Sequence, residues 1–259
     1  MSHVLHHRIP PPLRSLERGL VREWRLLRFM AATLLAALTP ATYTVAVRRS
    51  MAQAVCFSAW QVLPGYALLA ILFGAATTHI MVVTAASYGL SHLALEAVVR
   101  VLVVEIIPLA AALFVAMRSG AAFLNRLTAL RANNVDLRQV STFDQQVLPG
   151  VVGNFFAVVL LTLVSGTLVL CVAYVVVYGL TPWGLAGFTH LVGQIFDPVT
   201  APGLLLKIVL FALAVGIAPA TVVLDSARQG ALSSDMRITA RLFLMLTVIE
   251  VAALVLLHF

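Results

Sequence analysis

Residues 147–179 read VLPGVVGNFFAVVLLTLVSGTLVLCVAYVVVYG, a stretch without one charged side chain. A helix rises about 1.5 Å per residue, so about 20 predominantly apolar residues cross the hydrocarbon core of a bilayer. This stretch is longer than that and can cross with some tilt. It predicts a transmembrane helix and makes the chain an integral membrane protein.

The composition of the whole chain agrees with this prediction. Of its 259 residues, 61% are hydrophobic and 10% are charged, whereas soluble domains average about half and about a quarter. A soluble core cannot bury that much apolar surface. Cys56 and Cys171 lie in apolar runs without the C-x-x-C spacing of metal or redox sites, so we expect both to be buried small hydrophobic residues.

Four further apolar runs are separated by segments that contain Gly, Pro and charged residues. They cover residues 63–87, 93–117, 203–224 and 238–258. The sequence therefore predicts an all-α integral membrane protein, a single membrane domain over residues 1–259 with a transmembrane bundle of about five helices over 63–258.

The N-terminal region, residues 1–50, differs from these runs. Arginines and leucines alternate over residues 1–28 at a spacing that gives a basic amphipathic helix, which we expect on an anionic membrane surface. The apolar stretch 29–47 has arginines at both ends and Pro40 in its middle. Because spanning would place one arginine cluster on the wrong side, we interpret it as an interfacial or re-entrant helix.

The arginines also predict the topology. With five spans, segments 118–146 and 225–241 fall on one side of the membrane and segment 180–200, which has no Lys or Arg, on the other. Cytoplasmic loops carry the excess of Lys and Arg. The N-terminus is thus predicted inside and the C-terminus outside, with 180–200 as an outer loop rich in turn residues. The arginines that decide this are Arg118, Arg126, Arg131, Arg138, Arg228, Arg237 and Arg241.

Ionisable residues inside a span cost a few kcal/mol each and need a partner, a cavity or a function. In the second span, Glu96 and Arg100 are one helical turn apart and could neutralise each other. Glu105 precedes Pro108, whose missing N–H frees a backbone carbonyl and kinks the helix. A broken helix with a carboxylate usually lines a cavity.

Lys207, at the start of the fourth span, has two interpretations. It could extend to the headgroups at the outer interface, or it could share a polar chamber with Glu105. For Glu250 in the fifth span and His79 in the first, we expect partners inside the bundle and no further role.

Several short motifs, taken in order, extend this pattern. Glu105-Ile106-Ile107-Pro108 is followed, thirteen residues after the glutamate, by Arg118-Ser119-Gly120. This resembles the MlaE (YrbE) family of ABC transporter permeases, in which Glu-Leu-Gly-Pro precedes Gly-Arg-x-Gly at that spacing. Further segments similar to the family are Leu63-Pro64, Tyr88-Gly89, Lys207–Phe211, and Asp235–Leu242 with Arg237 and Arg241 in the two arginine places.

The resemblance implies an MlaE-like permease fold, with an N-terminal interfacial helix and five spans, in the bacterial inner membrane. It implies a dimer with itself or a related permease, an ABC ATPase subunit that binds ATP and Mg²⁺, and an MCE-domain lipid-binding protein in the periplasm. The cargo would be phospholipid. The resemblance suggests Tyr88, Glu105 and Lys207 for substrate binding, and a coupling helix over 125–144 with Arg118, Arg131, Asn134 and Asp136 for contact with the ATPase.

The chain lacks the G-x-x-x-x-G-K-[ST] loop that cradles nucleotide phosphates, so ATP hydrolysis would come from another chain. It also lacks clusters with metal-ligand spacing and a Ser/His/Asp set. We therefore expect a permease that binds no cofactor and no nucleic acid, not an enzyme. Two alternatives stay open: a proton- or ion-coupled secondary transporter with Glu105 or Glu250 as relay, and a non-transporting partner subunit of a heteromeric complex.

Overall fold

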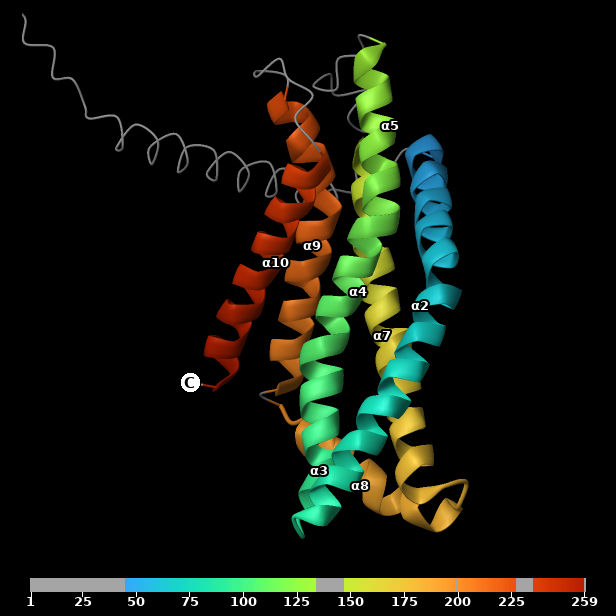
Figure 1. Cartoon of the computed structure of the whole chain (residues 1–259). Coiled ribbons are helices and arrows are strands. Elements are labelled where there is room, and N and C mark those ends of the chain that lie inside the picture. The colour runs from blue at the N-terminus through green and yellow to red at the C-terminus, as the bar shows by residue number, and fades with distance from the viewer. Residues whose placement is uncertain (1–44, 134–146, 199, 227–234, 259) are drawn as a thin grey trace, which may run out of the picture. The chain divides into compact units, whose positions relative to one another are not determined.

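The computed structural model describes residues 45–133, 147–198, 200–226 and 235–258, and these residues form helices joined by short turns (Figure 1). By its contacts the chain divides into two compact units, Met1–Thr42 and Tyr43–Phe259, and every described residue belongs to the second. The basic amphipathic helix predicted for residues 1–28 lies outside the described residues. In chain order the elements are α2 (Val45–Ser87), α3 (Ser91–Val98), η2 (Val99–Ile106), α4 (Ile107–Val115), η3 (Ala116–Gly120), α5 (Ala121–Ala132), α7 (Leu148–Tyr178), η5 (Pro182–Gly184), α8 (Leu185–Ile195), α9 (Thr200–Ser226) and α10 (Asp235–His258).

The prediction of an all-α membrane protein is confirmed. Within the described part of the chain, four helical stretches are long and apolar enough to cross a membrane, and α10 adds a shorter apolar helix over Leu242–Val255. The four longer stretches are Leu63–Ser87, Ala94–Leu130, Leu148–Tyr178 and Thr200–Pro219.

Successive long helices run in opposite directions along the bundle (Figure 1). The helices α2, α7 and α10 run one way, and the helices from α3 to α5, together with α9, run the other way. The chain therefore enters α2 from one side of the bundle and leaves α10 in the direction of the other side.

The segment from Ser91 to Ala132 forms one uninterrupted helical rod. Two stretches of it, η2 and η3, are π-helical, with wider turns than the α-helix. At the end of η2 the N–H of Ile107 donates to the carbonyl of Leu102, five residues earlier. Pro108 follows directly, so the disturbance expected around this proline takes the form of a wide turn within a continuous rod.

Glycines let neighbouring helices approach closely. A Cβ atom on Gly153 of α7 would lie 3.1 Å from the backbone of Ala54 in α2, and one on Gly216 of α9 would lie 2.9 Å from the carbonyl oxygen of Val151 in α7. Small residues at such positions are typical of helix packing in membranes. These contacts fix α2, α7 and α9 against one another.

Two clusters of buried apolar side chains fill the bundle. One includes Tyr66 and Phe211, and the other includes Val104 and Phe188. Val104 and Phe211 both contact the side chain of Lys207. The candidate site therefore lies where the two apolar clusters meet.

The structure corrects two expectations, one about the segment 180–200 and one about the cysteines. The first span lies at Leu63–Ser87, as its apolar run predicts, and it is part of the longer helix α2. The segment 180–200, expected as a loop, holds η5 and α8. Cys56 and Cys171 are exposed on the surface of the chain rather than buried, because each lies on a helix face that packs against no other described helix.

Candidate functional site

Lys207 is one of the largest fully buried side chains among the described residues, with 1% of its surface exposed. It lies in α9, between apolar neighbours. The interpretation that its ammonium extends to lipid headgroups is therefore wrong. The stem of the side chain points into the bundle instead, where partners for the charge are available.

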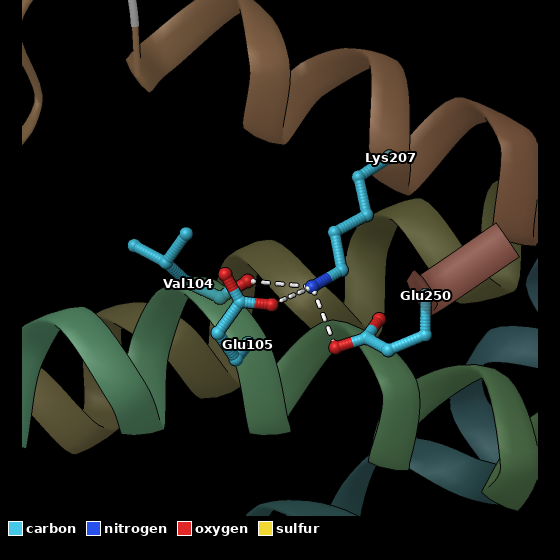
Figure 2. Close-up of polar contacts among 4 residues, drawn as sticks. All are labelled: Val104, Glu105, Lys207 and Glu250. Atoms are coloured by element: carbon cyan, nitrogen blue, oxygen red, sulfur yellow. Dashed lines mark hydrogen bonds and ion pairs between the residues drawn. The ribbon is translucent and has the colours of Figure 1, made fainter. Parts of the chain in front are cut away.

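The ammonium of Lys207 joins three segments of the chain (Figure 2). Its Nζ donates to the carboxylate of Glu105 in η2, to Oε1 of Glu250 in α10 at 2.9 Å, and to the carbonyl oxygen of Val104 in η2 at 3.3 Å. Both carboxylates make ion pairs with it. We refer to Glu105, Lys207 and Glu250 as the charged cluster.

The carbonyl in this cluster is the one that Pro108 frees. In an α-helix the carbonyl of Val104 would accept the N–H of residue 108, which proline lacks. The ammonium of Lys207 supplies the missing donor. The interpretation of Pro108 as the residue that opens a polar position in the second span thus leads directly to the site.

The charges of the cluster do not balance. One ammonium faces two carboxyl groups, and both are largely buried, with 18% of the Glu105 side chain and 15% of the Glu250 side chain exposed. The second oxygen of Glu250, Oε2, is shielded from solvent and has no hydrogen-bond partner. The ring of Phe211, 5.9 Å from Nζ, adds a weak cation–π contact.

Glu250 is the member of the cluster that sequence reasoning left without a role. It was expected to find a partner in the bundle, and that expectation is confirmed by its bond to Lys207. A signal was present in the sequence, since Lys207 and Glu250 are opposite charges in two successive apolar helices. The same expectation is wrong for His79, which is exposed on α2.

Tyr88 does not join the cluster in this chain. It lies in the turn after α2 with 77% of its surface exposed. The rod rises about 1.5 Å per residue, which places Glu105 roughly 20 Å beyond Ser91 at the start of the rod. Of the three residues suggested for substrate binding, the structure brings together Glu105 and Lys207.

The residues suggested for coupling to an ATPase are only partly described. Arg118 is exposed in η3, and its neighbour Ser119 donates from Oγ to Oδ1 of Asn154 in α7 at 2.5 Å. The backbone of Arg131 continues α5, but its side chain, like Asn134 and Asp136, lies outside the described residues. The coupling helix expected over 125–144 is, up to residue 132, the end of the rod rather than a separate helix.

The other charged pair of the second span is a surface feature. Arg100 donates to Oε1 of Glu96 at 3.4 Å, and both side chains are about half exposed. The expectation that they neutralise each other is confirmed. Exposed pairs of this kind contribute little to stability. The pair of Glu96 and Arg100 is therefore a suitable control for the buried cluster.

Within the described ranges, no group of three or more His, Cys, Asp or Glu residues could hold a metal ion. The charged cluster contains a lysine at its centre. Its chemistry is that of proton exchange, ion pairing and recognition of a polar group.

Comparisons with known proteins point to one family. Residues 51–258, which include the whole charged cluster, match the family model described as Permease MlaE. No curated protein matches the chain. The match covers most of the chain and includes all five apolar helices.

Proposed function

Because this chain belongs to the MlaE permease family, we propose that it is the permease subunit of an ABC transporter that moves phospholipid between the bacterial inner membrane and a periplasmic MCE-type lipid carrier. The family makes it a membrane subunit of a transport system. A separate ATPase subunit would bind ATP and Mg²⁺, since the chain has no nucleotide-binding loop of its own. We also propose that it acts as a dimer, with itself or a related permease.

The observation that carries the proposal is the charged cluster in an otherwise apolar bundle. The ionisable side chains of Glu105, Lys207 and Glu250 meet inside the bundle of apolar helices. Burying such groups is costly, and membrane proteins keep them chiefly where an ion or substrate passes. A phospholipid needs this combination, an apolar path for its tails and a polar position for its headgroup.

In this proposal the headgroup phosphate competes for Lys207. All three donor positions of the ammonium are used, by Glu105, Glu250 and the carbonyl of Val104. A phosphate can bind only if it displaces one of these three acceptors, and displacing any of them loosens the contact of α9 with either η2 or α10. Lipid entry would thus be linked to a movement of these helices, and the closed cluster would be the resting arrangement.

The test compares variants by crosslinking of a photoreactive phospholipid to the purified protein. Lys207→Ala should reduce crosslinking at least about tenfold, as expected for the loss of a hydrogen-bonded charge, and should weaken the outer-membrane barrier in cells. Arg100→Ala is the control. It removes an exposed positive charge of the same bundle and should change neither the crosslinking nor the outer-membrane barrier.

Removing Lys207 alone leaves two buried carboxyl groups without their cation, which can destabilise the fold. The test therefore needs a second variant that also removes the two negative charges. The triple variant Lys207→Met, Glu105→Gln, Glu250→Gln keeps similar shapes without charges and should fold. Wild-type levels of crosslinking and barrier function in this variant would contradict the proposed role of the cluster.

A second experiment addresses the ATPase partner. Arg131 lies near the end of the rod, and Arg131→Glu should abolish co-purification of the ATPase by placing a negative charge on the proposed docking surface. The matched change Arg100→Glu, near the other end of the same rod, should leave co-purification intact. Retained binding in Arg131→Glu would place the docking surface elsewhere.

The surplus carboxylate of the cluster favours one other function, that of a proton-coupled transporter with Glu250 as relay. The two functions differ in their energy source. Transport that continues without ATP and stops when the proton gradient is collapsed would support the proton-coupled transporter, and the reverse result would support the ABC permease.

A further inference from the structure

The two carboxyl groups of the charged cluster are held close together by the ammonium between them. The Nζ of Lys207 is 2.9 Å from Oε1 of Glu250 and makes a closer contact with Oε2 of Glu105. These two carboxyl oxygens are therefore less than twice 2.9 Å apart. Two like charges at such a distance in a low-dielectric interior do not both ionise readily.

No second cation among the described side chains reaches the cluster. Arg100 is exposed and paired with Glu96, and Arg118 lies thirteen residues along the rod from Glu105, roughly 20 Å away. Arg126 is further along, and Arg49 is exposed near the beginning of α2. Lys207 is thus the one described positive charge available to two carboxyl groups.

The other titratable side chains around the cluster do not add a charge to it. The hydroxyl of Tyr66 on α2 donates to the carbonyl of Ile107 at 3.2 Å, and that of Tyr174 on α7 donates to the carbonyl of Thr181. The ring of Tyr178 packs against the rings of Tyr174 and Phe188. Cys171 on α7 and His190 on α8 are exposed.

We propose that Glu105 and Glu250 share one bound proton at neutral pH, so that the closed cluster of two carboxyl groups and one ammonium has no net charge. Without that proton the interior of the bundle would carry an unbalanced negative charge, which is unfavourable in surroundings of low dielectric constant. Glu250 is the better carrier, because its Oε2 is shielded from solvent and has no hydrogen-bond partner among the described residues. The proton belongs to the pair of carboxyl groups rather than to either residue alone.

A proton fits this position better than a metal cation does. A proton bonds to one carboxyl oxygen and needs no space of its own. A monovalent metal ion would need several oxygen ligands, while the centre of this site is already occupied by the positively charged Nζ of Lys207. The proposal stands independently of which cargo the permease moves.

Infrared spectroscopy of the purified full chain in lipid bilayers tests the proposal, because a protonated carboxyl group has a carbonyl stretch distinct from that of a carboxylate. The wild-type protein at pH 7 should show a band that Glu250→Gln removes, since the remaining Glu105 then pairs with Lys207 and ionises. Glu105→Gln should remove the band for the same reason. Glu96→Gln, at the exposed pair, is the control and should leave it unchanged.

If the two carboxyl groups share the proton, either single substitution is sufficient to remove the band. A wild-type spectrum with no band sensitive to these substitutions would show both carboxyl groups ionised and overturn the proposal. A band removed by only one of the two substitutions would also overturn it, because the proton would then be held by burial of one residue alone. Lys207→Met should increase the band about twofold, since both carboxyl groups are then protonated. These outcomes do not depend on transport activity.

Discussion

Pro108 determines the local geometry of the candidate site. Its missing N–H leaves the carbonyl of Val104 without a helical partner, and this carbonyl accepts a hydrogen bond from Lys207. The wide turns of η2 immediately before the proline carry Glu105, which binds the same ammonium. Pro108 thus frees one of the three acceptors that surround the buried charge, and a second acceptor, Glu105, lies three residues before it.

Pro108→Ala should separate stability from function. Alanine restores the N–H and is more favourable in a helix interior by about 3 kcal/mol, so the thermal unfolding temperature should not fall. The carbonyl of Val104 would return to its helical partner and Lys207 would lose one acceptor. Phospholipid crosslinking should fall at least severalfold. Unchanged crosslinking would show that the freed carbonyl has no part in the site.

At the scale of residues, the sequence predicted what depends on neighbours along the chain. Glu105 and Pro108 are three residues apart, and their interpretation needed only the rules of the helix. Glu250 could not be placed in this way, because its partner lies in another helix and the rotation of each helix about its axis is decided by packing. The grouping of Tyr88 with Glu105 failed because Tyr88 lies in the turn before the rod, and Glu105 lies roughly 20 Å beyond the start of the rod.

At the scale of helices, close packing depends on positions without a side chain. Gly216 of α9 lies against the backbone of Val151 in α7, with 2.9 Å between that carbonyl oxygen and an added Cβ. A backbone atom cannot move aside as the end of a flexible side chain can. The distance between α7 and α9 is therefore limited by this glycine, and α9 is the helix that carries Lys207.

Gly216→Ala should lower the free energy of unfolding by about 1–3 kcal/mol, the usual cost of overpacking a close contact. Gly65→Ala is the matched control, because an added Cβ there meets nothing within 4 Å and alanine is the better helix former. Thermal unfolding in the same detergent compares the two. Equal unfolding temperatures would mean that α7 and α9 can separate without loss.

Helix ends were less predictable than membrane spans. The apolar runs gave the positions of the spans within a few residues, since hydrocarbon excludes charges. They did not show that α2 extends ahead of its apolar run or that the helix of the second span continues to Ala132. Outside the hydrocarbon a helix is stabilised by its own hydrogen bonds and by good helix formers such as Leu124 and Leu130. Neither of these produces a continuous apolar run that marks the helix in the sequence.

At the scale of the molecule, the direction of the helices agrees with the topology inferred from the arginines. In the described bundle the chain enters α2 from one side and leaves α10 in the direction of the other (Figure 1). Asn133 follows α5 at one end, and Gln194 lies in α8 at the other. Which end faces the cytoplasm stays a prediction from charge placement.

Single cysteines at these two positions test the orientation, after Cys56 and Cys171 have been replaced by serine. Gln194→Cys should react with a membrane-impermeant maleimide in cells whose inner membrane is intact. Asn133→Cys should react only after that membrane is opened. Both positions are exposed on the chain, so accessibility reports the side of the membrane. The opposite pattern would reverse the assigned orientation.

The continuous rod from Ser91 to Ala132 has a mechanical consequence. Between Arg131 and Glu105 it extends roughly 40 Å at the usual helical rise, with no loop to absorb a displacement. The wide turn beside Pro108 at the end of η2 and the wide turns of η3 interrupt the regular spacing along that length, so bending or a change of pitch is concentrated at these two places. A movement of the polar end of the rod would thus reach the buried ammonium along one continuous helix that can bend at two π-helical places.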